Sequence, residues 1–137
     1  MYTINLWPIL VASIVAFGIG ALWYSPMLFG GEWAALTKTT DSDLAEARAG
    51  GVWKLYVTQF VVTVISFFIL AFIIASTNAV GGSNGAFFGF IVWLGFTATT
   101  ATSGILWEKK TFKLALIDVV SVLLNLVIGG AIIGAWR

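Results

Sequence analysis

Residues 111–135 read TFKLALIDVVSVLLNLVIGGAIIGA. Apart from Lys113 near the start, Asp118 is the one charged side chain in this stretch. About 20 apolar residues, rising about 1.5 Å each in an α-helix, cross the hydrocarbon core of a bilayer. The stretch therefore predicts a transmembrane helix. Because a carboxylate in hydrocarbon costs a few kcal/mol, we expect Asp118 to face protein or water and to mark a functional site.

The composition of the whole chain is that of a membrane protein. Of its 137 residues, 60% are hydrophobic and 9% are charged, and the mean hydropathy is +1.01. A soluble domain carries about 25% charged residues. The absence of cysteine and histidine excludes disulfides, cysteine nucleophiles, histidine bases and the usual zinc sites. We therefore expect no enzymatic activity and no metal or other cofactor. The net charge of +1 says nothing about nucleic acid, but the sequence has no basic tail, so we expect no nucleic-acid partner.

Four apolar stretches are long enough to span a bilayer. The expected helices cover residues 5–24, 52–76, 86–107 and 112–136. Because lipid offers the backbone no hydrogen-bond partner, helices are the default structure there. The first stretch has no basic region before it, so we interpret it as a retained helix rather than a cleaved signal peptide. The predicted fold class is all-α, an integral membrane four-helix bundle in which residues 1–137 form one transmembrane domain.

The connections between these helices predict the orientation of the protein. Residues 25–51 form the longest connection, with a capped surface helix expected at about 40–48, whereas the Gly-rich residues 77–85 predict a tight turn. Six basic residues lie in or beside the first and third connections: Lys38, Arg48, Lys54, Lys109, Lys110 and Lys113. The positive-inside rule places these connections in the cytoplasm and both termini outside.

Two segments of the first half of the chain have counterparts in the second half. WKLYVTQ at 53–59 aligns with FKLALID at 112–118, and GALW at 20–23 aligns with GILW at 104–107. A duplication would give two tandem hairpins related by a pseudo-two-fold axis along the membrane normal, with Gln59 and Asp118 at equivalent depth. The alternative is chance similarity, since apolar helices use few residue types.

Polar side chains recur on single faces of the expected helices. The candidates for an ion or substrate path are Asp118, Gln59, Ser121, Asn125, Thr97, Thr100 and Ser103. They could converge on a hydrated interior near the cytoplasmic side. Alternatively, the hydroxyls bond their own helices or a neighbouring helix, each such interhelical bond contributing about 0.6–2 kcal/mol. In that reading Asp118 is a lysine-paired or neutral carboxyl that locks the fold.

An aromatic segment follows the first expected helix. We single out an interfacial aromatic motif within it, consisting of Trp23, Tyr24, Pro26, Phe29, Gly30 and Trp33. Pro26 ends the helix, because the residue before a proline is driven out of the α conformation. The segment is either an anchor at the membrane surface or a lid over the polar interior.

At these residues the chain resembles the domain-of-unknown-function 1761 family, small bacterial and fungal membrane proteins of four helices. The resemblance rests on GALWYSP at 20–26, FGGEW at 29–33, WLGF at 93–96, Glu108 and the closing GAIIGAW at 130–136. It implies the fold and a bacterial inner (plasma) membrane location, but no established activity. The family favours asparagine near positions where this chain has Thr102-Ser103 and Asp118.

Small residues four apart predict close helix contacts. They occur at Ala12, Ala16 and Gly20, at Gly85 and Gly89, and at Gly130 and Gly134. We expect a homo-oligomer, because a single four-helix chain encloses little interior. The first functional hypothesis is a channel or transporter that binds a small ion or solute at Asp118. The second is a non-catalytic accessory or lipid-interacting protein, which uses the aromatic motif to contact lipid or a partner.

Overall fold

The computed structural model describes residues 2–137, which form helices and connections without a strand. Four helical units are long and apolar enough to cross a membrane: α1 (Leu6–Trp23), α4 (Trp53–Ser76), the unit Gly82–Trp107 and α7 (Phe112–Ala135). Two short helices, α2 (Gly30–Leu36) and α3 (Asp41–Ala49), lie in the first connection. The prediction of an all-α protein with four helices that are long and apolar enough to span a membrane is confirmed.

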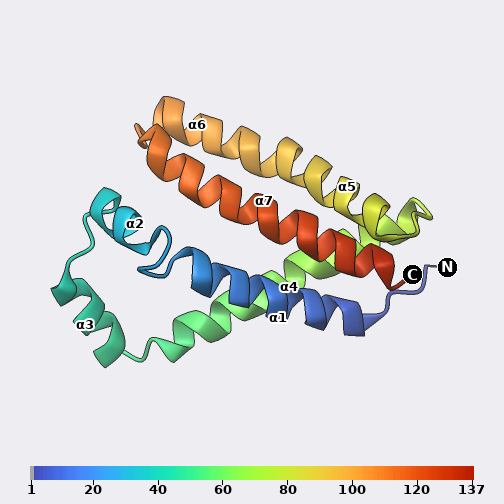
Figure 1. Cartoon of the computed structure of the whole chain (residues 1–137), viewed down its shortest axis with the longest axis horizontal. Helices are drawn as coiled ribbons and strands as arrows, with labels where there is room; N and C mark the ends of the chain where they lie inside the picture. Colours follow the sequence, from blue (N-terminus) through green and yellow to red (C-terminus); the bar gives the residue numbers. More distant parts are fainter. Residues whose placement is uncertain (1) are drawn as a thin grey trace.

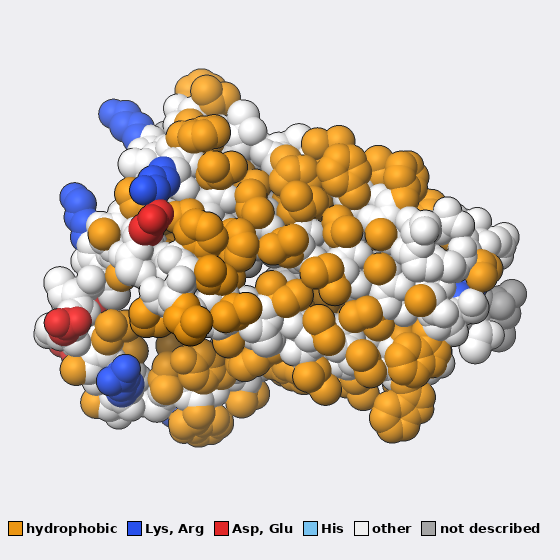
Figure 2. Space-filling view, in the orientation of Figure 1, with side chains coloured by type: hydrophobic (Ala, Val, Ile, Leu, Met, Phe, Trp, Pro, Cys, Tyr) orange, Lys and Arg blue, Asp and Glu red, His pale blue; other side chains and the backbone are white. Residues whose placement is uncertain are grey.

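The helices are arranged around α7, and both chain ends lie at one end of the molecule (Figure 1). The unit Gly82–Trp107 runs along one side of α7, α1 lies along the other side, and α4 crosses α1. The helices α2 and α3 lie at the end opposite the termini. Most of the charged side chains in view gather at that same end, while the body of the molecule is apolar (Figure 2).

Glycines bring α7 and α5 (Gly82–Val92) into backbone contact. A methyl group at Gly85 would collide with the backbone of Gly130, and one at Gly89 would collide with the backbone of Leu126. The expected start of this helix at residue 86 is wrong, since the helix begins at Gly82. Glycine indicates a turn when it is read locally, but here it allows two helices to approach closely in lipid.

The third span is not a uniform α-helix. Between α5 and α6 (Thr99–Trp107) lies η1 (Trp93–Ala98), a turn of π-helix. Such turns are rare and frequently occur at functional sites. The sequence analysis did not predict this turn, although Gly95 and Thr97 interrupt the apolar residues within the segment.

The buried core lies toward the end of the molecule that holds the termini. Ile9 of α1, Phe67, Leu70 and Ile74 of α4 and Ile133 of α7 are almost completely buried. In contrast, residues 53–66 of α4 are exposed or half-buried. This half of α4 diverges from α7, so the four helices do not pack as a bundle along their whole length. The proposed pseudo-two-fold relation between the hairpins stays a prediction.

Candidate functional site

Asp118 lies in the second turn of α7, half-buried beside the C-terminal end of α1. The hydroxyl of Tyr24, the residue that caps α1, donates a hydrogen bond of 2.7 Å to Oδ1 of Asp118. This contact joins two features that the sequence presents separately, the aromatic motif and the acid in the last span. The sequence predicts that the motif is either an anchor at the membrane surface or a lid over the polar interior. The structure places Tyr24 of the motif in contact with the acid.

Two indole groups hold the turn of α7 that carries Asp118. Nε1 of Trp23 donates to the carbonyl oxygen of Ile117 at 3.0 Å, and Nε1 of Trp93 donates to the carbonyl oxygen of Val119 at 2.8 Å. These carbonyls belong to the residues on either side of Asp118. Trp23 comes from α1 and Trp93 from η1, so the turn is held by both neighbouring spans. Such bonds fix the position of the carboxylate relative to its surroundings.

A tight backbone turn over residues 24–30, which we call the elbow, presents Tyr24 to Asp118. The carbonyl oxygen of Ser25 accepts hydrogen bonds from the backbone N–H groups of Leu28 and Gly30, at 3.1 and 2.9 Å. A side chain at position 30 would collide with the backbone of Tyr24 and Ser25, so the elbow requires glycine there. The ring of Trp33 on α2 packs edge-on against Tyr24, with centroids 5.9 Å apart. The aromatic motif is therefore a folded unit that positions the Tyr24 hydroxyl.

The lysines near Asp118 form ion pairs with other acids. Lys113 lies 3.2 Å from Glu32 of α2, and Lys110 lies 3.1 Å from Glu108. No salt bridge to Asp118 occurs among residues 2–137. The lysine-paired carboxyl considered from the sequence is thus not what the structure shows. The carboxylate of Asp118 is bound by a neutral hydroxyl instead.

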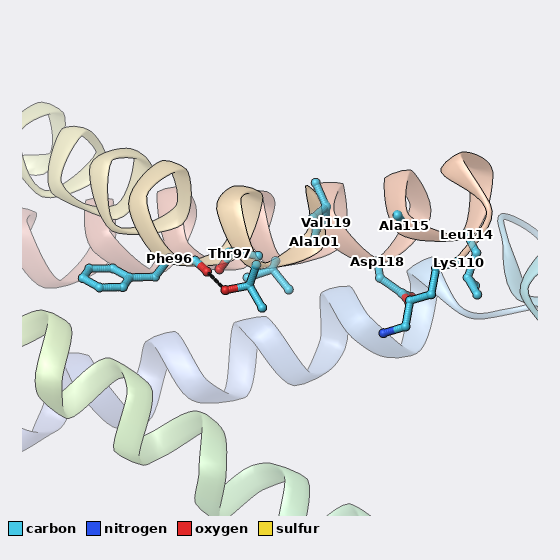
Figure 3. A pocket seen from close by; sticks show the side chains of 10 residues that line it. Phe96, Thr97, Ala101, Lys110, Leu114, Ala115, Asp118 and Val119 are labelled. Atoms are coloured by element: carbon cyan, nitrogen blue, oxygen red, sulfur yellow. Dashed lines mark hydrogen bonds between the residues drawn. The ribbon is translucent and has the colours of Figure 1, made fainter. Parts of the chain in front are cut away.

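A groove of about 410 Å³ opens beside Asp118 between α7 and the η1–α6 segment. We call it the lateral groove, and its lining residues are Phe96, Thr97, Thr100, Ala101, Lys110, Leu114, Ala115, Asp118, Val119 and Val122. Figure 3 shows the Phe96 ring at one end, with Lys110 and Asp118 toward the other. The groove exists because α6 does not continue the close glycine contact that α5 makes with α7. Its surface combines one acid with largely apolar walls.

Three of the candidate path residues, Asp118, Thr97 and Thr100, line this groove together. The hydroxyl of Thr100 donates to the carbonyl oxygen of Phe96 in its own helix. The hydroxyl of Ser103 similarly donates to the carbonyl oxygen of Thr99, at 3.3 Å. These two hydroxyls therefore follow the bonding pattern that we considered as the alternative to a hydrated path.

The other candidates do not line the groove. Gln59 is exposed on α4, where its amide nitrogen reaches only the hydroxyl of Thr63 at 3.4 Å. Ser121 is buried, and the side-chain oxygen of Asn125 is buried without a hydrogen-bond partner among the described residues. The structure thus does not bring Gln59 to Asp118, because the first half of α4 diverges from α7.

The elbow and the groove lie within the region that a protein-family comparison identifies. The model of a family described as "Protein of unknown function (DUF1761)" matches residues 7–134, which is nearly the whole chain. The chain belongs to the DUF1761 family. No curated protein and no solved structure matches it. Membership in DUF1761 agrees with the resemblance inferred from the sequence and assigns no activity, so function has to be argued from the site itself.

Proposed function

We propose that this DUF1761 protein is a small membrane channel or transporter that binds a cation or proton at Asp118. The observation that carries the proposal is the position of this carboxylate. It lines the lateral groove, within a helix apolar enough to span the bilayer, and no salt bridge to it occurs among the described residues. An acid in a membrane span is costly and usually serves a path or a site. No catalytic step is part of the proposal.

The proposed location is the inner membrane of a bacterium, with both termini outside. Two observations support this orientation. The termini lie at one end of the molecule, and the lysine-containing connections lie at the other (Figures 1 and 2). The positive-inside rule assigns the lysine-rich end to the cytoplasm. Asp118 then lies about 9 Å along the helix axis from Phe112, the first residue of α7, since it is six positions further along the helix.

The proposed assembly is a homo-oligomer. In the single chain, Gln59 lies on the exposed half of α4, which would place an amide group against hydrocarbon. Its nitrogen has one long hydrogen bond to the Thr63 hydroxyl, and the unsatisfied part of an amide in an apolar medium costs several kcal/mol. A second copy that covers residues 53–66 would remove this cost. If the two hairpins are also related by the proposed pseudo-two-fold axis, Gln59 is the counterpart of Asp118 on that surface.

The test is a flux measurement on the full chain in proteoliposomes. Wild-type protein is expected to carry H⁺, Na⁺ or K⁺ down an imposed gradient, and Asp118→Asn is expected to change the rate. Glu46→Gln serves as the matched control, because Glu46 is an exposed acid on the surface helix α3. If wild type, Asp118→Asn and the empty liposomes give the same flux for all three ions, the proposal is wrong.

An accessory or lipid-interacting role is the second candidate. An apolar hollow of about 330 Å³ between α1 and α4 favours it, with lining residues Ile14, Phe17, Tyr56, Val57, Phe60 and Val61. A lipid acyl chain or the apolar part of a partner would fit these walls. Native mass spectrometry should then detect a retained lipid or a co-purifying chain that is reduced by changing Phe17 and Phe60, which line the hollow, to alanine. A homogeneous, lipid-free preparation of folded protein would contradict this role.

A further inference from the structure

We propose that the lateral groove binds a hydrophobic ammonium compound, with its cationic group at Asp118 and its apolar part directed toward Phe96. The inference rests on the proposed function, because it specifies the class of solute for the same site. It follows from three properties of the groove: its charge, the limited number of its oxygen ligands and the nature of its walls.

The charge of the groove favours a cation. Lys110 also lines it, but the ammonium group of Lys110 is paired with Glu108 at 3.1 Å. The next lysine along the chain, Lys113, is paired with Glu32. Tyr24 contributes a neutral hydroxyl to Asp118. Because both lysines are paired with acids, Asp118 is the charged residue of the groove surface that has no salt bridge among the described residues, and a positively charged group complements it.

The oxygen ligands favour an organic cation over a divalent metal ion. Divalent ions such as Ca²⁺ and Mg²⁺ take about six or more oxygen ligands. One oxygen of Asp118 already accepts the bond from Tyr24, and the Thr100 hydroxyl donates to its own helix. Residues 2–137 contain no group of three or more acidic side chains placed to hold a metal. An ammonium group with hydrocarbon substituents requires only one anion and apolar or aromatic contacts.

The walls of the groove fit the apolar part of such a compound. Ala101, Val119 and Val122 provide aliphatic surface, and the ring of Phe96 is 73% exposed. Figure 3 shows this ring at the opposite end of the groove from Lys110. The volume of about 410 Å³ is in the range of small-molecule sites. Because the groove is open and lies beside α7, a helix apolar enough to span the bilayer, we expect a compound dissolved in the bilayer to reach it.

Equilibrium dialysis of the full chain in phosphatidylcholine nanodiscs tests the inference. The probe is radiolabelled benzyltrimethylammonium, measured against empty nanodiscs, and its uncharged isostere neopentylbenzene serves as a competitor. Wild type is expected to bind the probe saturably, and neopentylbenzene is expected to compete weakly. Asp118→Asn is expected to weaken binding at least about tenfold, because it removes the anionic partner of a poorly hydrated charge.

A second pair of variants tests the aromatic contact. Phe96→Leu is expected to weaken binding about two- to fivefold, because the benzyl group of the probe loses its contact with an aromatic ring. Phe87→Leu is the matched control, since Phe87 is exposed on α5 and does not line the groove, and Glu46→Gln is the control for Asp118→Asn. If Asp118→Asn does not fold, the comparison of Phe96→Leu with Phe87→Leu still tests whether the probe binds in the groove.

The inference is overturned if wild type binds no more probe than empty nanodiscs, or if Asp118→Asn binds as wild type does. Unchanged affinity in Phe96→Leu also overturns the proposed orientation of the ligand. The outcome is separable from the proposed function. Asp118-dependent ion flux without probe binding would support the proposed transport and contradict the binding of an ammonium compound. Saturable probe binding without ion flux would support the binding of an ammonium compound and contradict the proposed transport.

Discussion

Tyr24 and Asp118 are 94 positions apart in the chain, and a hydrogen bond of 2.7 Å joins them. The same α1 end supplies Trp23, whose indole binds the carbonyl oxygen of Ile117. A polar group facing hydrocarbon has no partner, so this arrangement satisfies one carboxylate oxygen inside the protein. At the level of single residues, the aromatic motif and the acid form one site.

Removing the Tyr24 hydroxyl should lower the stability of the protein without unfolding it. We expect Tyr24→Phe to lower stability by about 1 kcal/mol, because one hydrogen bond to the carboxylate is lost. Thermal unfolding in detergent measures the change. Tyr56→Phe is the control, since Tyr56 is exposed and its hydroxyl has no hydrogen bond among the described residues. Equal melting temperatures for the two variants would contradict the role assigned to the bond.

Gly30 should not tolerate a side chain. Gly30→Ala places a methyl group against the backbone of Tyr24 and Ser25, so the elbow must open, at a cost of about 1–3 kcal/mol. Gly31→Ala is the matched control one position later, because no atom lies within 4 Å of its added methyl group. Thermal unfolding is expected to separate the two variants. If Gly30→Ala is as stable as Gly31→Ala, the elbow is not as tight as described.

At the scale of helices, the contact between α5 and α7 contrasts with the gap between α6 and α7. Glycines allow the first pair to touch through backbone atoms, and the lateral groove opens where this contact ends. The π-helical turn η1 lies at the transition. We call the glycine contact between α5 and α7 the seam. Both the seam and the lateral groove follow from where small residues lie along this helix pair.

The seam can be tested by adding one methyl group. Gly130→Ala would collide with the backbone of Gly85, so we expect α5 to move away and stability to fall by about 1–3 kcal/mol. Gly18→Ala in α1 is the control, because its added methyl group has no atom within 4 Å. The comparison is made by thermal unfolding in detergent. A melting temperature of Gly130→Ala at or above that of Gly18→Ala would contradict the close contact.

The surface helix α3 should weaken in acid. Asp43 accepts a hydrogen bond from the backbone N–H of Thr40, while the Thr40 hydroxyl caps the Asp43 backbone N–H. The bond from the Thr40 backbone is the main reason that the pKa of Asp43 lies below its ordinary value of 3.8. Because the pKa of Asp43 is lower in the folded helix than in the unfolded chain, its ionised carboxylate stabilises the helix at any pH above the unfolded-state pKa. This stabilisation is lost as the pH falls through the folded-state pKa.

Amide hydrogen exchange of α3, followed by NMR as the pH is lowered below about 4, measures this effect. Protection of the first turn is expected to decrease as Asp43 becomes protonated. Asp43→Asn cannot titrate at this position, so its α3 should show no such step. A step of equal size in both proteins would show that another group is responsible.

At the scale of the whole molecule, most of the charged side chains in view lie at one end, and this uneven distribution predicts a direction across the membrane. The charged end holds α2 and α3, and the opposite end holds both termini (Figures 1 and 2). The positive-inside rule turns this asymmetry into an orientation. Since the chain contains no cysteine, single cysteines can report on it without background.

Cysteine labelling should distinguish the two ends. In right-side-out membrane vesicles, a membrane-impermeant maleimide is expected to label Ser83→Cys near the turn before α5 and to leave Glu46→Cys on α3 unlabelled until the vesicles are opened. Both positions are exposed in the structure. The reverse pattern would show that the termini face the cytoplasm and would overturn the proposed orientation.

The sequence alone was enough to predict the four spans, because about 20 apolar residues in lipid have helix as the one way to satisfy the backbone. It also predicted that the first helix ends before Pro26 and identified Asp118 as the acid in a span. These are local properties of chemistry and length. The start of the third span was misplaced, because glycines that pack a helix and glycines that turn a chain look alike in one dimension.

Only the tertiary structure decided which groups meet. Asp118 meets Tyr24 rather than Gln59 or a lysine, since α1 packs against the first turns of α7 while the first half of α4 diverges. Uniformly apolar helices carry little information about their mutual rotation, because most of their faces suit lipid and protein equally well. Small residues and a few buried hydrogen bonds set that rotation, and their effect appears only when the helices are packed together.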